Sequence, residues 1–180
     1  MADLTRLYDF AQGQPIRDSE VDAELNQLVQ RANAPEVVLP TGSFSVYRNQ
    51  AHSYGAAATK LLYDSEEWDA SAWFDLPNAR YFPPRAGIFR LSAFQRVSGL
   101  VASYLFLYVY KNNSLHRVLG GSPPGTGGGY AASAGGSALV QANGTTDYFE
   151  VWAQHAEGSL MAFSTGVAYS YFQGEMVGKL

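Results

Sequence analysis

Three histidines are the residues of this chain with the clearest potential for acid–base or metal chemistry. They are His52, His116 and His155, and the chain contains no cysteine. A hydrolase nucleophile commonly sits in a Gly-X-Ser-X-Gly turn, and zinc proteases carry two histidines in His-Glu-X-X-His. Neither motif occurs, and thiolate nucleophiles, thiolate metal sites and disulfides are excluded. We therefore expect no catalytic residues, no enzymatic activity and no cofactor.

Four carboxylates lie close together in the sequence, at Asp64, Glu66, Glu67 and Asp69. They lack the spaced oxygen ligands and the central glycine of a calcium-binding loop. Glycoside cleavage needs two carboxylates at a defined separation across a cleft, which sequence spacing does not supply. We interpret this acidic string as a polar turn after a strand and assign no metal ligand to it.

The elements that must position these groups are strands. Aromatic residues make up 14% of the chain, a composition that favours sheets over helices. Strands are predicted at 44–47, 59–63 and 88–94, the last one directly after Gly87. A chain of 180 residues is long enough for one domain with a sizeable core and a short additional segment.

A boundary between two parts is predicted near residues 35–42, which contain two prolines and a glycine. Residues 1–40 hold seven acidic and three basic side chains, which accounts for the whole net charge of −4. The basic residues are scattered, so nucleic acid is not an expected partner. No run reaches the roughly 20 apolar residues of a membrane span, and the first residues do not resemble a secretory signal. We expect synthesis and assembly in a cytoplasm.

A short helix is predicted at about residues 19–31. Val21, Leu25, Leu28 and Val29 follow the i, i+4, i+7, i+8 spacing of one helical face. An isolated helix of this length is marginal in water. We expect it to pack on trimer partners, on another protein or on its own domain.

The segment 101–110 is a predicted strand with apolar residues on both faces. A strand at a solvated surface alternates with polar residues, so its aromatic face is expected to be covered. A trimer axis and a loop of the same chain are the two candidates for that cover. The aromatic face consists of Tyr104, Phe106, Tyr108 and Tyr110.

Residues 119–137 contain eight glycines and two prolines, which predicts a long loop with no regular element across its length. Long loops on rigid scaffolds often carry binding sites. Tyr130 could stack on a sugar ring, with Gly127 and Gly128 beside it. An exposed tip without a ligand is the alternative.

Six landmarks resemble, in the same order, the globular head of complement component one, subcomponent q, which is related to the tumour-necrosis-factor fold. The resemblance covers roughly residues 41–180 and implies an all-β, ten-stranded antiparallel jelly-roll sandwich at 40–180 that forms homotrimers. Tyr171 is then predicted as a trimer-interface residue as well. Some relatives bind calcium near the three-fold axis, but no ligand can be assigned here. The landmarks are Phe44-Ser45-Val46, Lys60 to Asp64, Phe74-Asp75, Ala86 to Arg90, a predicted turn at Lys111-Asn112-Asn113, and Tyr169 to Gly174.

Residues 1–39 resemble the N-terminal segment of tailed-phage fibre and virion-appendage proteins. An aromatic-Asp-Phe strand, a Gly-X-Pro-Ile turn and an Asp-Ala-Glu-Leu-Asn helix carry this second resemblance. It implies a strand-and-helix segment that anchors the protein to a capsid, portal or tail protein. The predicted anchor residues are Leu7, Tyr8, Phe10, Pro15, Ile16, Val21, Leu25, Leu28 and Val29.

The two resemblances together predict a non-enzymatic phage structural protein on the virion surface, a homotrimeric spike, short fibre or head decoration assembled in the host cytoplasm. The alternative is an adhesin that binds a host receptor or surface carbohydrate through the jelly-roll loops. A third interpretation, a cellular cytosolic assembly without a virus, applies if the N-terminal resemblance is accidental.

Overall fold

A computed structural model of the chain describes residues 25–26, 42–100, 104–122, 130–156 and 161–180. The chain divides into two compact units, Met1–Val38 and Leu39–Leu180. Within the first unit, Leu25 and Asn26 have helical backbone and both are exposed. The remainder of the predicted helix and the other predicted anchor residues lie outside the described residues.

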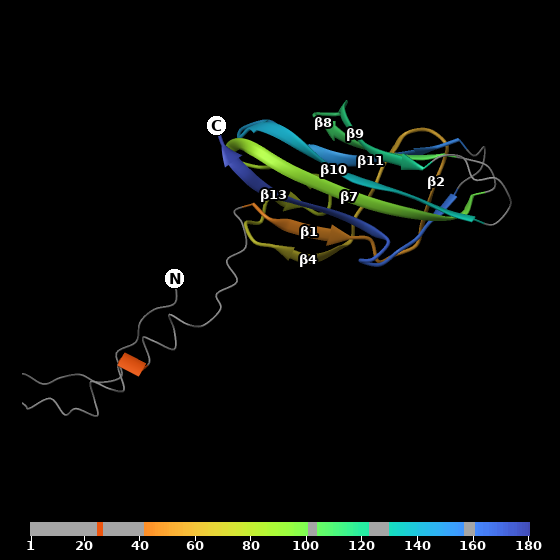
Figure 1. Cartoon of the computed structure of the whole chain (residues 1–180), viewed down its shortest axis with the longest axis horizontal. Helices are drawn as coiled ribbons and strands as arrows, with labels where there is room; N and C mark the ends of the chain where they lie inside the picture. The colour runs from red at the N-terminus through yellow and green to blue at the C-terminus, as the bar shows by residue number, and fades with distance from the viewer. Residues whose placement is uncertain (1–24, 27–41, 101–103, 123–129, 157–160) are drawn as a thin grey trace, which may run out of the picture. The chain divides into compact units, whose positions relative to one another are not determined.

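The described part of the second unit contains thirteen strands, all paired antiparallel, in two sheets (Figure 1). The prediction of an all-β antiparallel jelly roll is confirmed. There are more strands than the ten expected because several segments pair over only two or three residues. Sheet A contains β1 (Phe44–Tyr47), β2 (His52–Tyr54), β4 (Ser65–Asp69), β7 (Ala86–Leu100), β10 (Tyr130–Asn143), β12 (Met161–Phe163) and β13 (Ser170–Lys179). Sheet B contains β3 (Thr59–Lys60), β5 (Phe74–Asp75), β6 (Arg80–Tyr81), β8 (Leu105–Lys111), β9 (Ser114–Ser122) and β11 (Phe149–His155).

Long strands form the centre of sheet A. The order is β2-β12-β7-β13-β1-β4, and β10 pairs along the other edge of β7 (Figure 1). Sheet B has the order β5-β6-β11-β8-β9, with β3 beside β11. Strand β9 therefore ends sheet B, and it packs near β10, which lies at an edge of sheet A.

The core between the sheets follows from the alternation of side chains along each strand. In β8, Leu105, Leu107 and Val109 are fully buried, as the two-residue period predicts. Phe44 of β1 stacks on Tyr81 with ring centres 4.4 Å apart. It also meets Phe172 of β13 edge-on at 4.9 Å. Aromatic pairs of this kind add about 0.5–1.5 kcal/mol each beyond the burial of their area.

Asparagines shape two turns at one end of the sandwich. Asn112 and Asn113 have positive φ angles of 53° and 64°, as a two-residue hairpin turn requires, and the predicted turn between β8 and β9 is confirmed. After β10, the side-chain oxygen of Asn143 accepts the backbone N–H groups of Thr145 at 2.9 Å and Asp147 at 3.1 Å. The turn at 143–147 is therefore fixed by one carboxamide.

The prediction of one long loop over residues 119–137 is wrong at both ends. β9 continues to Ser122 and β10 begins at Tyr130. Glycine is required where these strands meet, because a side chain on Gly120 would overlap the backbone of Gly135, and one on Gly136 would overlap that of Leu119. Glycine here serves close packing of two backbones rather than a flexible loop. The predicted loop residues Gly127 and Gly128 lie outside the described residues.

The acidic string is also not the turn that we predicted, because residues 65–69 form the edge strand β4. Three of the four carboxylates of the acidic string accept hydrogen bonds from other segments of the chain. Asp64 accepts the N–H of Asn49 at 2.7 Å, Glu67 accepts the hydroxyl of Ser45 at 2.7 Å, and Asp69 accepts the N–H of Phe74 at 2.8 Å. The described residues contain no group of three side chains suited to hold a metal ion. They also contain no helix with the length and apolar character needed to cross a membrane.

Candidate functional site

The residues predicted for the trimer interface lie on two different surfaces. Phe106, Tyr108 and Tyr110 are on the outward face of sheet B, opposite in direction to the buried residues of β8. Tyr104 is half-buried, with its ring 5.0 Å from that of Phe106. Tyr171 is on the outward face of sheet A, because its neighbour Phe172 is in the core. The structure therefore does not bring the five residues together.

Aromatic rings cover much of the outward face of sheet B. Tyr110 stacks on Trp152 of β11 with ring centres 4.5 Å apart and an interplanar angle of 17°. Phe106 and Tyr108 stack along β8 at 6.2 Å. The Tyr108 hydroxyl donates to the side-chain oxygen of Gln154 at 3.1 Å. Burial, together with the nearby Tyr104 and Tyr110, raises the pKa of Tyr108 above its ordinary value. These rings form a continuous layer that is only half-buried in one chain.

On the same outward face lies a charged network centred on Glu150, which is 1% exposed. Its carboxylate accepts bonds from Arg80 at 2.8 Å, Lys60 at 3.1 Å and the Trp152 indole N–H at 3.1 Å. Burial acts to raise the pKa of Glu150, but the hydrogen bonds from Arg80, Trp152 and Lys60 hold this pKa below its ordinary value. The network ties β3, β6 and β11 together, and its members are too far apart in sequence for spacing to reveal it.

The outward face of sheet A has a different chemistry. Phe94 of β7 lies opposite Tyr171 of β13, with stacked rings 5.9 Å apart. The next outward pair along the same strands is Ser92 and Gln173, which are polar. After it comes Arg90 with Glu175, an ion pair of 3.0 Å. An aromatic row, a polar row and a charged row therefore follow one another across this face.

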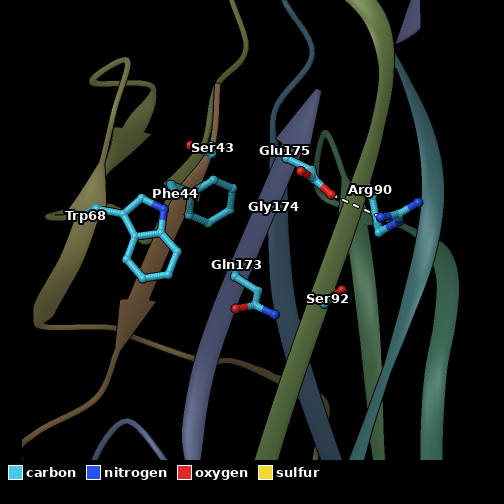
Figure 2. Close-up of a pocket in the computed structure, with 8 residues that line it drawn as sticks. All are labelled: Ser43, Phe44, Trp68, Arg90, Ser92, Gln173, Gly174 and Glu175. Carbon is cyan, nitrogen blue, oxygen red and sulfur yellow. Dashed lines mark hydrogen bonds and ion pairs between the residues drawn. The ribbon is translucent and has the colours of Figure 1, made fainter. Parts of the chain in front are cut away.

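A pocket of about 320 Å³ opens on this face between β4 and β7 (Figure 2). Trp68 of β4 forms one wall and is 39% exposed. The pairing of β1 with β4 shifts register between Ser45 and Val46, an irregularity of the kind that re-aims edge side chains. Ser43 beside the pocket is 5% exposed, and its hydroxyl has no hydrogen-bond partner among the described residues. The lining residues are Ser43, Phe44, Trp68, Arg90, Ser92, Gln173, Gly174 and Glu175.

Known protein families and curated proteins give no match to the chain. Solved structures do. The globular domain of a zebrafish complement 1qA protein shares 15% identity, covers 78% of this chain and 98% of its own length, and superposes with a TM-score of 0.55. Eiger TNF from S. frugiperda shares 8% identity, covers 79% of this chain and 96% of its own length, and has a TM-score of 0.58. Murine APRIL at pH 8.5 shares 10% identity, covers 77% of this chain and 98% of its own length, and has a TM-score of 0.52.

The chain has the jelly-roll fold of the complement 1q and TNF domains. At these identities the likeness is one of fold. It confirms the resemblance predicted for residues 41–180 at that level, and the covered share of this chain matches the extent of the second unit. The phage-appendage resemblance of residues 1–39 stays a prediction.

On this complement 1q/TNF-type scaffold, the sheet A pocket combines groups suited to a neutral polar ligand. It has one exposed indole, one amide, hydroxyl groups and an ion pair whose charges cancel. Small-molecule pockets commonly join an apolar surface to a few placed polar groups in this way. Sequence analysis missed Trp68 because the acidic string around it was interpreted as a turn. The signal was present in the exposed-strand composition of Ser65–Asp69, which carries one large aromatic residue.

The histidines lie on three separate strands of the two sheets. His52 is on β2, His116 is on β9 and His155 is on β11. His155 is 1% exposed, and its Nε2 atom is 3.0 Å from the backbone oxygen of Tyr54. The fold therefore distributes these imidazoles over both sheets and does not gather them in the sheet A pocket.

Proposed function

We propose that the protein is a non-enzymatic homotrimer that forms a spike, short fibre or decoration on the surface of a tailed-phage virion. The observation that carries the trimer is the aromatic layer on the outward faces of the sandwich. Half-buried rings such as Tyr108, Trp152 and Tyr171 leave apolar surface in water in a single chain. Interfaces between subunits are enriched in such residues. The complement 1q/TNF-type fold supports the same proposal.

Symmetry limits which aromatic face can serve the trimer. The two outward faces of a sandwich point in opposite directions. A closed ring of three needs contact surfaces inclined to each other, whereas opposed surfaces build an open stack. Only one of the two faces therefore lines the three-fold contact. The sequence-based prediction divides between them, with Tyr104, Phe106, Tyr108 and Tyr110 on sheet B and Tyr171 on sheet A.

The virion role is supported by the N-terminal unit. Its sequence resembles a virion-anchor segment, and it forms a unit separate from the jelly roll, Met1–Val38. In this proposal it attaches the trimer to a capsid, portal or tail protein in the host cytoplasm, and the jelly roll is exposed on the finished particle.

Two measurements test the proposal in sequence. Light scattering on the full-length protein should give three times the chain mass of 19.6 kDa. Deletion of residues 1–38 should then leave a folded trimer that no longer incorporates into particles produced from the phage that encodes it. A monomeric full-length protein would refute the trimer. A truncated protein that still incorporates would refute the anchor.

An adhesin that binds host-surface carbohydrate is the second candidate function, and the sheet A pocket favours it. The site differs from the loop predicted from sequence, because its exposed ring is that of Trp68 on β4. Titration with neutral monosaccharides, followed by tryptophan fluorescence, should give a saturable change that Trp68→Ala abolishes. Phe82→Ala removes an aromatic ring of nearly equal exposure, 40%, outside the pocket and is the matched control. No saturable change in the native protein would remove this candidate.

A further inference from the structure

A second cavity lies between the two sheets at the edge formed by β9 and β10. Its volume is about 500 Å³. Farther along the same two strands, the backbones touch at Gly120 and Gly135. Every residue that lines the cavity is polar or charged, in contrast to the core beside it. They are Lys111, His116, Arg117, Gln141, Asn143 and Asp147.

The single carboxylate in this cavity is fully occupied by partners from the protein. Asp147 accepts Lys111 at 2.8 Å, the backbone N–H of Asn143 at 2.8 Å and the Asn112 side chain at 2.9 Å. Burial acts to raise the pKa of Asp147, but the bonds from Lys111, Asn112 and Asn143 hold it below its ordinary value. Asp147 is thus ionised and neutralised by Lys111, and it does not compete for other cations in the cavity.

Donors in the same cavity remain uncommitted. Arg117 is exposed, and its described hydrogen bond is the one from Nη1 to the backbone oxygen of His116 at 2.9 Å. The Nε2 atom of His116 is buried and has no hydrogen-bond partner among the described residues. A buried polar atom without a partner costs free energy, and an atom of a ligand bound in the cavity would supply that partner. Gln141 of β10 also lines the cavity and adds an amide.

We propose that this cavity binds an oxyanion, a carboxylate or a phosphate group carried by a small ligand. Lys111 and Arg117 against Asp147 leave one net positive charge among the lining residues. The guanidinium group of Arg117 offers a planar pair of donors that matches two oxygens of one anion, and the His116 imidazole lies beside it.

The protonation state of His116 gives the site a readout. Burial, followed by the charges of Arg117 and Lys111, lowers the pKa of His116, while Asp147 acts in the opposite direction. An anion that settles beside the imidazole favours its charged form and raises this pKa. Binding should therefore strengthen as the pH falls, and it should be visible at one histidine of the three.

The test is an NMR titration of the full-length protein, observing the imidazole carbon protons of all three histidines. Inorganic phosphate and D-glucuronate are added in separate arms, with chloride at equal ionic strength as the reference. We expect a saturable shift at His116, with a raised pKa, and binding weaker by at least about tenfold in Arg117→Ala, which removes the paired charge-assisted donors. Arg85→Ala removes an exposed arginine outside the cavity and should bind as the native protein does. A response to phosphate alone or to glucuronate alone assigns the anion, and a response to both shows that the shared oxyanion is recognised.

Three results would overturn the proposal. The first is no saturable shift at His116 up to about 50 mM of either anion, far above a millimolar dissociation constant. The second is an equal shift in chloride, which is ionic screening alone. The third is unchanged affinity in Arg117→Ala. If the alanine variant fails to fold, Arg117→Lys is measured in its place, because lysine keeps the charge but lacks the planar pair of donors. The proposal does not rest on the virion role or on the trimer, which light scattering on the same samples tests separately.

Discussion

The two outward faces of the sandwich differ in how far their charged side chains are buried. On sheet B the carboxylate of Glu150 is 1% exposed and is held by two cations and the indole of Trp152. On sheet A the pair Arg90 and Glu175 is on the surface, with side chains 55% and 33% exposed. A buried network is costly to disrupt, whereas an exposed pair contributes little to stability and can exchange its partner for a ligand or a neighbouring chain. The Glu150 network thus ties strands of sheet B to one another, whereas the charged part of sheet A is available for contacts.

The largest effect is expected from two matched variants that test which outward face forms the trimer contact, Tyr108→Asp on sheet B and Tyr171→Asp on sheet A. We expect only one of them to convert the trimer to a monomer, because opposed faces cannot both line a closed three-fold contact and a desolvated charge is not tolerated in an interface. Light scattering measures the change, a loss of two thirds of the mass. Tyr108→Phe and Tyr171→Phe should remain trimers. Dissociation of both aspartate variants, or of neither, would contradict the geometry.

Removal of the buried carboxylate should give the next largest effect. Glu150→Ala leaves Lys60, Arg80 and the Trp152 indole without their acceptor. The two cations are partly exposed and regain water, so the free energy of unfolding should fall by about 2 kcal/mol rather than by the larger cost of a fully buried orphan charge. Urea denaturation at neutral pH measures this, with Glu150→Gln as the variant that keeps the side-chain shape. A loss below about 0.5 kcal/mol would show that the network is not a stabilising element.

Acid should act through the same group. The folded pKa of Glu150 lies below its ordinary value of 4.5, so its contribution is fully present above that pH and is lost as the pH falls through the folded pKa. Stability of the native protein should therefore decrease as the pH drops below about 4.5. The decrease should be shallower in Glu150→Gln, with the remaining slope owed partly to Asp147, whose pKa is lowered too. Identical slopes in denaturation midpoints from pH 5 to 3 would contradict the assignment.

The smallest effect should come from the exposed pair on sheet A. Arg90→Ala should change the free energy of unfolding by about 0.5 kcal/mol or less, since solvent and salt screen such pairs. Denaturation at low and high salt measures this change. The difference in the free energy of unfolding between the native protein and Arg90→Ala should disappear at high salt. A loss as large as that in Glu150→Ala would remove the contrast between the two faces.

Sequence patterns predicted the parts of this fold that depend on neighbours in the chain. The alternation of β8 gave the correct buried face, and the Asn112–Asn113 pair gave the correct turn. The glycine-rich segment misled because glycine has two uses, freedom in loops and close approach of backbones. Gly120 and Gly135 serve the second use, and only the position of the facing strand distinguishes it.

The candidate sites depend on pairing between distant strands and were not predictable for that reason. Glu150 meets Lys60 and Arg80 across 90 and 70 residues of chain. The oxyanion cavity joins Arg117 of β9 to Gln141 of β10, although His116 was recognised from sequence as a chemically capable residue. Tyr171 and the β8 aromatic residues were all predicted for the trimer interface, and the two-sheet architecture places them on opposite outward faces, a distribution that depends on strand pairing.

The turn after β10 has a consequence for the chemical ageing of the protein. Asn143 precedes Gly144. An asparagine before a glycine deamidates when the backbone nitrogen of the glycine attacks the carbonyl carbon of the asparagine side chain and ammonia leaves. Here the carboxamide oxygen is fixed by the N–H groups of Thr145, Thr146 and Asp147, and its nitrogen donates to Thr146 at 2.8 Å. We expect this bond to deamidate far more slowly in the folded protein than in a peptide of the same sequence, which mass spectrometry after prolonged storage would show. The turn would thereby protect Asn143, which precedes a glycine, from deamidation over long periods.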